Sequence, residues 1–371
     1  MRYFKSANVY DEALARIRWL FDEFPNVIVS SSGGKDSTVC FHLALQVARE
    51  KGRLPLKVMW IDQEAEWQAT VDQQRSVMYH PDVEPRWYQM PMKLFNATSG
   101  SDHWLQCWDP AAKKKWVHPQ DPVSIRENVY GTDRFHKLFD AVLLKEYGDT
   151  PTANISGVRC EESPGRTLGL TTQATYKWVT WGKVVSRVKH HYTFCPIYDW
   201  SYTDVWKAIH QHGWPYNHIY DLQYQHGIPV LTMRVSNVHH ETAVHSLFYL
   251  QEAEPDTYAR LTQRLSGVDM AAKLGADDYF VRDLPYMFAS WEQYRDYLLE
   301  GREGVLVSYV ETGTAAGEAR LREGDVITRV ENSPVTSLSS FETLYGRMKE
   351  KSKQALVLVK RRKDAVFVLL E

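Results

Sequence analysis

Cysteine is scarce in this sequence and never stands in a short paired motif. The 371 residues contain four cysteines, and no two of them form a C-x-x-C arrangement. A zinc ribbon or an iron–sulfur cluster held by local cysteine pairs is therefore not encoded. Four separated thiols suit a reducing compartment in which they stay unpaired. No cysteine follows Cys195.

The chain also lacks an excess of charge and any long apolar run. Its formal net charge is -2, so nothing draws the whole molecule toward nucleic acid or an anionic membrane. Contact with a polyanion would need a local basic patch, and the candidates are residues 113–115, 187–191 and 361–363. No secretory segment opens the sequence and no apolar stretch is long enough to cross a bilayer. We therefore expect a cytoplasmic protein that does not enter the membrane.

A loop of small residues is the most informative feature that is present. The apolar residues 27–29 are followed by Ser-Ser-Ser-Gly-Gly-Lys-Asp-Ser at residues 30–37. Such a loop turns sharply into a helix whose first amides can hold a phosphate group. It has neither the Walker spacing nor that of a dinucleotide fold. The predicted phosphate-binding residues are Ser32, Gly33, Gly34, Lys35, Asp36 and Ser37.

Helical and strand patterns alternate around this loop. We predict helices over residues 11–24, 35–51 and 64–78, and strands over residues 27–30 and 56–61. Alternation of this kind is typical of a parallel twisted sheet with helices on both faces. Ligands bind at the carboxyl ends of such strands, where the loop and Asp62 must both lie.

A second polar loop is expected farther along the chain. Residues 93–130 are rich in tryptophan and proline and indicate an ordered, aromatic-rich insertion, followed by a helix over 133–147 and a strand near 154–156. The loop at residues 157–166 carries Arg159 and Arg166, and arginine offers a planar fork to phosphate or sulfate oxygens. A loop of surface ion pairs is the alternative interpretation.

The ordered succession of motifs resembles the phosphoadenosine phosphosulfate reductase family, within the superfamily of pyrophosphate-loop (PP-loop) enzymes. The matching stretches are residues 32–37, Ile61-Asp62 with Glu66 and Thr70, residues 157–166, residues 196–206 and residues 216–221. The resemblance implies an adenine nucleotide alpha-hydrolase-like fold that binds ATP or phosphoadenosine phosphosulfate. It further implies that the loop holds phosphate, that Asp62 lies near the nucleotide, and that Lys35, Asp36, Arg159 and Arg166 carry the chemistry.

One departure from this family bears on the reaction. Its assimilatory reductases carry a C-terminal Glu-Cys-Gly-x-His nucleophile, which this chain lacks. We therefore expect sulfur transfer or substrate adenylylation rather than assimilatory sulfate reduction. Cys160, next to Arg159, could supply a thiolate, although a small packed side chain is the simpler interpretation.

A metal ion has few candidate ligands. Asp36 or Asp62 could hold a Mg²⁺ ion that bridges phosphate oxygens. His239, His240, Glu241 and His245 lack the H-E-x-x-H order of a zinc site, and an ordinary helix face explains them more simply.

The sequence changes character after residue 300. Residues 301–371 resemble a bacterial PDZ domain of the type attached to trypsin-like proteases, with Leu-Arg-Glu-Gly-Asp-Val-Ile at 321–327 as the specific match. We therefore predict a nucleotide-binding domain over residues 1–300 and a small β-rich PDZ-like domain over 301–371. A PDZ domain adds the end of another chain as a strand to an open sheet edge, here at residues 305–308. A capping domain that binds nothing is the alternative.

These observations leave two classes of function open. The first is an enzyme that uses an adenine nucleotide, with the PDZ-like domain docking a protein partner or peptide terminus. Sulfur modification of nucleic acid is a variant of this class. The second is a nucleotide-binding regulator that recruits a partner without turnover.

Overall fold

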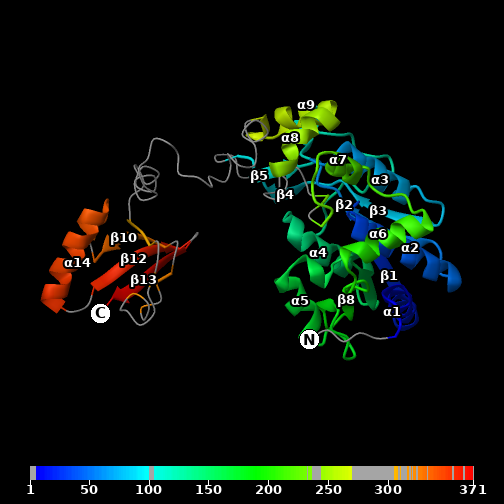
Figure 1. Cartoon of the computed structure of the whole chain (residues 1–371), viewed down its shortest axis with the longest axis horizontal. Helices are drawn as coiled ribbons and strands as arrows, with labels where there is room; N and C mark the ends of the chain where they lie inside the picture. The colour runs from blue at the N-terminus through cyan, green and yellow to red at the C-terminus, as the bar shows by residue number, and fades with distance from the viewer. Residues whose placement is uncertain are drawn as a thin grey trace. The chain divides into compact units, whose positions relative to one another are not determined.

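The computed structural model describes residues 6–99, 104–231, 233–235, 244–269 and, with short gaps, 305–370 (Figure 1). The chain divides into two compact units, Met1–Tyr279 and Phe280–Glu371, which we treat separately. The predicted boundary between residues 300 and 301 lies outside the described residues. Among the described helices, none is long and apolar enough to cross a membrane.

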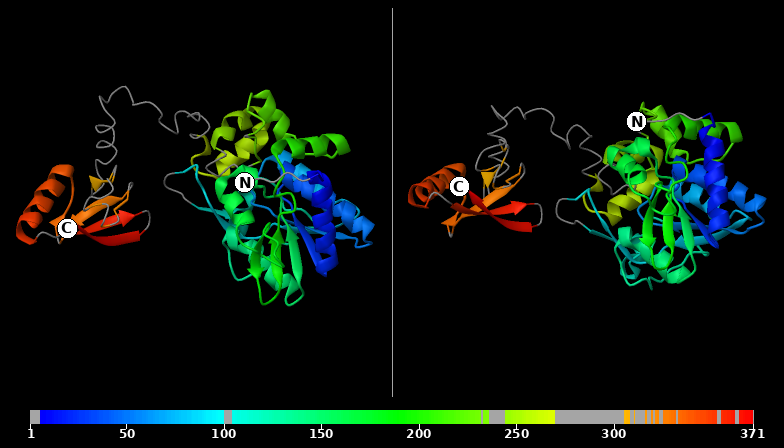
Figure 2. Two further views of the ribbon diagram at one scale, coloured as in Figure 1. Left: turned by 60° about the horizontal axis from the view of Figure 1, so that its bottom comes forward. Right: turned by 90° about the horizontal axis from the view of Figure 1, so that it is seen from below.

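A six-stranded sheet forms the centre of the first unit (Figure 2). Its strands follow the order β3-β2-β1-β6-β8-β7, and every neighbouring pair is parallel except the edge pair β7 and β8. The bounds are β1 Asn26–Ser30, β2 Leu56–Ile61, β3 Val83–Tyr88, β6 Thr152–Ile155, β7 Gly182–Ser186 and β8 His191–Phe194. The predicted parallel α/β architecture is confirmed.

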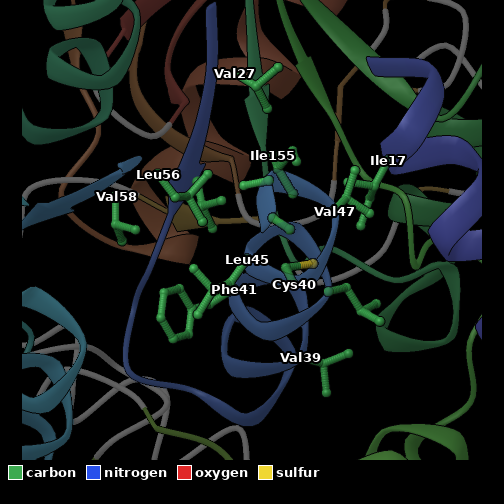
Figure 3. Close-up of a cluster of buried hydrophobic side chains, with 14 of the residues drawn as sticks. Ile17, Val27, Val39, Cys40, Phe41, Leu45, Val47, Leu56, Val58 and Ile155 are labelled. Carbon is green, nitrogen blue, oxygen red and sulfur yellow. The ribbon is translucent and has the colours of Figure 1, made fainter. Parts of the chain in front are cut away.

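Alternating side chains place two hydrophobic cores on opposite faces of this sheet. In β1, Val27 and Val29 belong to the first core, whereas Ile28 belongs to the second. The first core is shown in Figure 3 and packs the sheet against α1 (Val9–Glu23), α2 (Lys35–Glu50), α3 (Gln68–Met78) and α6 (Tyr202–His212). The second packs it against α4 (Phe135–Tyr147), α7 (Ile219–Gln225), α8 (Val244–Ala253) and α9 (Pro255–Arg264).

Most predicted elements appear within a few residues of the expected bounds, but the third helix starts later. The sequence predicts a helix from Glu64, whereas α3 begins at Gln68. Glu64 has a φ of +64°, which a right-handed helix does not allow. Tight backbone hydrogen bonds from Ala65 to Gln63 and from Glu66 to Glu64 fold this stretch into a turn instead.

The aromatic-rich insertion is ordered where the structure describes it. It contains the antiparallel pair β4 (Met92–Phe95) and β5 (Trp104–Cys107), followed by the 3-10 helix η1 (Pro110–Lys115). Two further short helices, η2 (Cys160–Glu162) and α5 (Pro164–Thr171), follow β6.

The second unit is an antiparallel β structure with its own core. Its described strands are β9 Val305–Leu306, β10 Val326–Val330, β11 Ser333–Pro334, β12 Ala355–Arg361 and β13 Asp364–Leu370, and helix α14 spans Leu338–Ser352. Strand β10 pairs with β9, β11 and β12, and β12 pairs with β13. The PDZ-like strand pattern predicted from the alternating residues near the C-terminus is confirmed.

Candidate functional site

The glycine loop lies at the point where the order of the sheet reverses. Helix α2 leads from β1 to β2 on one side of it, whereas β6 pairs with the other side of β1. Crevices at such switch points, beyond the carboxyl ends of the strands, are where doubly wound sheets bind ligands. Gly33, with a φ of +75°, makes the turn, and Gly34 is the residue that precedes α2.

Hydroxyl groups hold the loop closed from within. The Ser37 hydroxyl accepts from the Ser32 amide at 3.2 Å and donates to the Gly34 carbonyl at 2.9 Å. The Thr38 hydroxyl donates to the same carbonyl at 3.0 Å. The first amides of a helix have no partner within the helix, and residues 34–37 at the start of α2 line the crevice.

A segment far along the chain fixes the other side of the loop. The Asn217 side-chain amide donates to the Gly33 carbonyl at 3.2 Å and to the Thr70 hydroxyl at 2.9 Å. The Tyr220 hydroxyl accepts from the Lys35 amide at 3.0 Å. These residues belong to the Tyr-Asn-x-x-Tyr stretch at residues 216–220, which therefore acts as a clamp on the glycine loop and explains why the two motifs occur together.

The loop after β6 approaches α2 so closely that only glycine fits. A Cβ atom on Gly157 would lie 2.7 Å from the Asp36 carbonyl carbon and 2.8 Å from the Ser37 amide nitrogen. Real Cβ atoms do not come this close to a rigid backbone. Gly157 thus brings the second polar loop against the start of α2.

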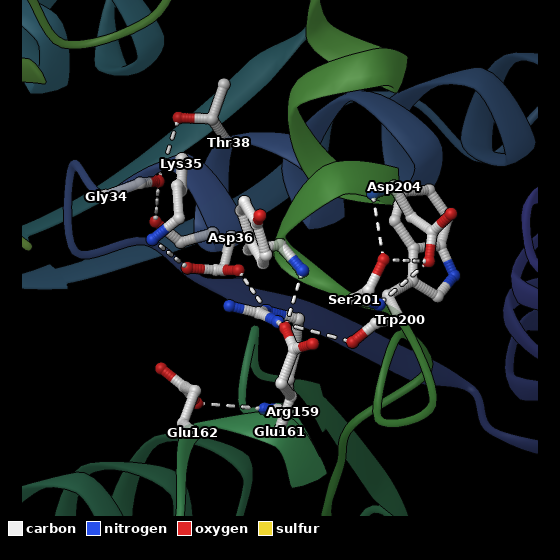
Figure 4. Close-up of polar contacts among 12 residues, drawn as sticks. Gly34, Lys35, Asp36, Thr38, Arg159, Glu161, Glu162, Trp200, Ser201 and Asp204 are labelled. Atoms are coloured by element: carbon white, nitrogen blue, oxygen red, sulfur yellow. Dashed lines mark hydrogen bonds and ion pairs between the residues drawn. The ribbon is translucent and has the colours of Figure 1, made fainter. Parts of the chain in front are cut away.

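Three of the predicted catalytic residues form one chain of charges (Figure 4). The Lys35 ammonium lies 3.2 Å from the Asp36 carboxylate, whose other oxygen accepts from the Arg159 guanidinium. Arg159 also donates to Glu161 at 2.8 Å and to the Trp200 carbonyl at 3.2 Å. The Arg159 side chain is only 4% exposed, so its guanidinium is committed to these partners. It holds the loop and α2 in place rather than facing the crevice.

The crevice itself is a cleft of about 460 Å³. It is lined by loop residues, by the end of β2, by α4 and by the second polar loop. Among the predicted site residues, Ser32, Gly34, Lys35, Asp36, Ser37 and Arg166 line it, whereas Gly33, Asp62 and Arg159 do not. Arg166 pairs with Glu162, and its side chain is 43% exposed. Arg166 is therefore the predicted arginine that can reach a ligand.

Sequence reasoning missed Arg234, which also lines the cleft. Its segment is tied to α7 because the Gln223 side chain donates to the Arg234 carbonyl at 2.7 Å and accepts from its amide at 3.1 Å. No recognisable motif surrounds Arg234. Its position after the Tyr-Asn-x-x-Tyr stretch is the one feature of the sequence from which a place in the site could have been predicted.

Asp62 directly follows β2 and is fully buried. Its carboxylate accepts from the Trp87 indole and the Gln89 amide, both at 2.9 Å, and from the Glu64 backbone amide at 2.9 Å. The His118 ring lies 3.3 Å away. Burial would lower the pKa of His118, and the Asp62 carboxylate more than offsets this, so that pKa is raised. In this arrangement Asp62 organises the strand ends.

Glu66 is the buried acid that does line the cleft. Its burial, with a contribution from the Asp62 charge, raises the pKa of Glu66 well above its ordinary value. Burial thus disfavours the charged form of a carboxyl group at a position where a negative charge would repel a phosphate.

The described residues offer little to a metal ion. No group of three or more His, Cys, Asp or Glu side chains among them is arranged to hold one. The oxygens of Asp36 are engaged by Lys35 and Arg159, and those of Asp62 by its four neighbours. Neither carboxylate is presented as a free ligand, so the predicted Mg²⁺ does not fit them in this arrangement. Residues 239–241 lie outside the described residues, as does the side chain of His245.

All four cysteines are buried. Burial raises the pKa values of Cys40 and Cys107, and it raises that of Cys195 to about 12. Cys160 packs with Leu170 and Cys195 in a small apolar cluster. No cysteine is among the described residues that line the 460 Å³ cleft.

Two known protein families match this chain. Residues 26–226 match the family described as the phosphoadenosine phosphosulfate reductase domain, and residues 281–368 match the PDZ domain. The first match covers more than half of the sequence, so the chain belongs to the phosphoadenosine phosphosulfate reductase family and carries a C-terminal PDZ domain.

Individual relatives are more distant. YbdN of Escherichia coli, an uncharacterized protein, is 28% identical over 310 residues, which are 79% of this chain and 75% of that protein. Phosphoadenylyl-sulfate reductase from Candida auris is 16% identical, covers 64% of this chain and 98% of its own, and has a TM-score of 0.35. The PDZ domain of HtrA3 is 18% identical over 20% of this chain and 70% of its own, with a TM-score of 0.18.

Proposed function

We propose that the first unit binds an adenine nucleotide, ATP or phosphoadenosine phosphosulfate, in the 460 Å³ cleft. The observation that carries the proposal is that the start of α2 lines a switch-point cleft together with Arg166 and Arg234. Helix amides and arginine forks together suit the charge and shape of a phosphate chain. Membership of the phosphoadenosine phosphosulfate reductase family supports the same ligand class.

Within this proposal the residues have different roles. Ser32, Gly33, Gly34 and Ser37 form the loop that receives phosphate oxygens, and Lys35 neutralises charge near its base. Asp36 and Arg159 hold Lys35 and the two loops in register. Arg166 and Arg234 neutralise the outer phosphates or a sulfate. Asp62 supports the strand end on which the nucleotide rests.

For the reaction, we propose substrate adenylylation or sulfur transfer rather than assimilatory sulfate reduction. Reduction by this family's thiol route needs a reactive thiolate, and the four cysteines are buried. In adenylylation with ATP, an acceptor oxygen forms a bond to the α-phosphorus while the bond to the bridging oxygen breaks. Pyrophosphate leaves with that electron pair. Positioning and charge neutralisation are the contributions expected of the protein.

Calorimetry with ATP and with phosphoadenosine phosphosulfate tests the binding site. A Cβ on Gly34 meets only ordinary contacts, 3.4 Å from the Tyr220 hydroxyl oxygen, so Gly34→Val should fold. Its side chain would stand where phosphate must approach the amides, and we expect binding to be lost. Gly346→Val, in open space on α14, is the matched control. If a folded Gly34→Val protein binds the nucleotides with unchanged affinity, the glycine loop is not the nucleotide-binding site.

Analysis of the nucleotide product then distinguishes an enzyme from a nucleotide-binding regulator. Incubation of the protein with ATP or phosphoadenosine phosphosulfate and a panel of acceptors should release pyrophosphate or another cleaved nucleotide product. Tight nucleotide binding with no product under any of these conditions would favour a regulator without turnover.

We propose further that the PDZ domain captures the carboxyl end of a partner protein. In the described part of this unit, β9 pairs only with β10, through Val305 and Leu306, so its other edge is open to an added strand. A fluorescent peptide with a free carboxyl end should bind, and its amidated counterpart should not. Equal binding of both would argue against recognition of a chain end.

A further inference from the structure

A second cavity of about 670 Å³ adjoins the nucleotide cleft on one face of the central sheet. The two spaces share five lining residues, namely Ser30, Phe139, Ser156, Val158 and Arg166. We call this cavity the sheet-face pocket. Its volume lies within the roughly 300–1,000 Å³ that is usual for small-molecule sites.

The floor of the sheet-face pocket is polar where a doubly wound sheet is normally apolar. Ser30, Asn154 and Thr193 come from three adjacent strands, β1, β6 and β8, and all line the pocket. The Ser30 hydroxyl donates to the Asn154 carbonyl oxygen at 2.8 Å, and the Asn154 amide donates to the Thr193 hydroxyl at 3.3 Å.

The same strands show that this polarity belongs to one face only. Their alternate residues, among them Ala153, Ile155 and Phe194, are buried in the first core. Asn154 is 3% exposed, and its amide and carbonyl groups each keep capacity for a further hydrogen bond. A row of polar side chains that lines a cavity, opposite an apolar face, is the arrangement expected of a ligand floor.

The walls and the rim define the chemistry of the occupant. Phe139, Val158, Leu170 and Val184 supply apolar wall surface. The one acid among the described lining residues, Asp140, is neutralised by Lys183 at 2.9 Å. Arg187, from the basic run at residues 187–191, also lines the pocket, and Arg166 stands where the pocket meets the nucleotide cleft.

We propose that the sheet-face pocket binds a small organic anion with an apolar body, next to the bound nucleotide. The apolar part lies against the α4 and α5 walls, polar groups meet the floor, and the anionic group faces Arg187 or Arg166. That this anion is the acceptor in the reaction rests on the proposed function, whereas its binding does not.

The probe for this pocket is 8-anilinonaphthalene-1-sulfonate, an aromatic sulfonate whose fluorescence rises in an apolar site. Titration of the full chain should show saturable binding. Thr193→Phe fills the floor and Arg187→Glu reverses the charge at the rim, and each should weaken binding at least tenfold. Arg187→Lys keeps the positive charge and should retain more of the binding than Arg187→Glu. The exposed Lys207→Glu, which does not line the pocket, is the control and should stay within twofold of the wild type.

Calorimetry with ATP on the same variants distinguishes the two proposals. ATP affinity should remain within twofold in Thr193→Phe and Arg187→Glu, because neither residue lines the nucleotide cleft. Absence of saturable probe binding, or binding unaffected by Arg187→Glu and by any folded Thr193→Phe protein, would overturn the sheet-face pocket. If the wild type does not bind ATP but the probe binds and responds to the variants as expected, only the nucleotide proposal is overturned.

Discussion

At the scale of single residues, the two arginines of the second polar loop have different surroundings. Arg159 is buried against Asp36, Glu161 and a backbone carbonyl, whereas Arg166 stands at the cleft with a side chain 43% exposed. The sequence gives both the same prediction because both occupy one polar loop. Only the fold shows that one is enclosed and the other is accessible.

Arg159→Ala should therefore act mainly on stability. It leaves the Asp36 carboxylate, whose side chain is 15% exposed, without its guanidinium partner. Breaking a buried pair in this way costs about 3 kcal/mol of the free energy of unfolding. Urea denaturation measures the loss, and adding Asp36→Asn should restore part of it. Equal stability of the wild type and Arg159→Ala would contradict the structural role.

Arg166→Ala should leave the fold intact and lower the affinity for the nucleotide. Exposed ion pairs such as Arg166 with Glu162 contribute about 0–1 kcal/mol to stability. Loss of a hydrogen bond to a charged phosphate or sulfate should reduce binding by about 1.5–3 kcal/mol, measured by calorimetry. Full nucleotide affinity in this variant would show that Arg166 does not contact the nucleotide.

The buried cysteines lead to a prediction about thiol chemistry. Cys40 and Cys107 are 0% exposed and Cys160 is 9% exposed. A disulfide reagent such as dithiobis-nitrobenzoate should titrate fewer than one thiol per folded chain and all four after denaturation. Cys160→Ser should also keep its nucleotide affinity and any turnover. A fast-reacting thiol in the native protein that Cys160→Ser removes would restore a thiolate mechanism.

At the scale of elements, the contact between the β6 loop and the start of α2 depends on one missing side chain. Gly157→Ala forces the two backbones apart, because the new Cβ would meet the Asp36 and Ser37 backbone below 3 Å. Overpacking of this kind costs about 1–3 kcal/mol. We expect lower thermal stability and weaker nucleotide binding together. Gly169→Ala, which meets nothing within 4 Å on α5, is the matched control.

Helix α2 also carries a partly buried histidine that should limit stability in acid. Burial lowers the pKa of His42 to about 4, and its ring stacks on Trp214 at 4.8 Å. The unfolded state binds a proton near pH 6.5, so the contribution of His42 is complete above that pH and is lost as the pH falls toward 4. The loss is on the order of 2–3 kcal/mol.

His42→Phe keeps a ring against Trp214 and removes this titration. Its free energy of unfolding should fall less steeply than that of the wild type between pH 6.5 and 4. His218→Gln, which alters a ring 84% exposed, should follow the wild-type curve. Parallel curves for the wild type and His42→Phe would show that the His42 ring is accessible to protons.

Local patterns predict elements well when one face is buried and the period is regular. The apolar residues 27–29 and the loop after them indicate β1 and α2 closely, because strand, turn and helix signals agree within a few residues. Glu64 gives no such signal, since its positive φ follows from the turn that encloses Asp62. Arg234 and the polar row on the sheet face arise from contacts between distant segments, which a single sequence does not display.

At the scale of the whole molecule, the described buried cores do not cross between the two units. Members of the two sheet cores all precede residue 270, whereas the third core, with Ile327, Val357 and Val368, lies within the described residues 305–370. Each unit thus has its own apolar interior, which is the physical requirement for independent folding.

Separating the chain after Tyr279 should therefore yield two folded parts. Residues 1–279 should keep the nucleotide affinity of the full chain, because the loop, its clamp and both arginines lie within them. Residues 280–371 should retain peptide binding at the edge of β9 that lies opposite its pairing with β10. Circular dichroism melting and calorimetry on each part measure these outcomes. If residues 1–279 unfold or lose the nucleotide, the second unit forms part of the site, and a role limited to recruitment is wrong.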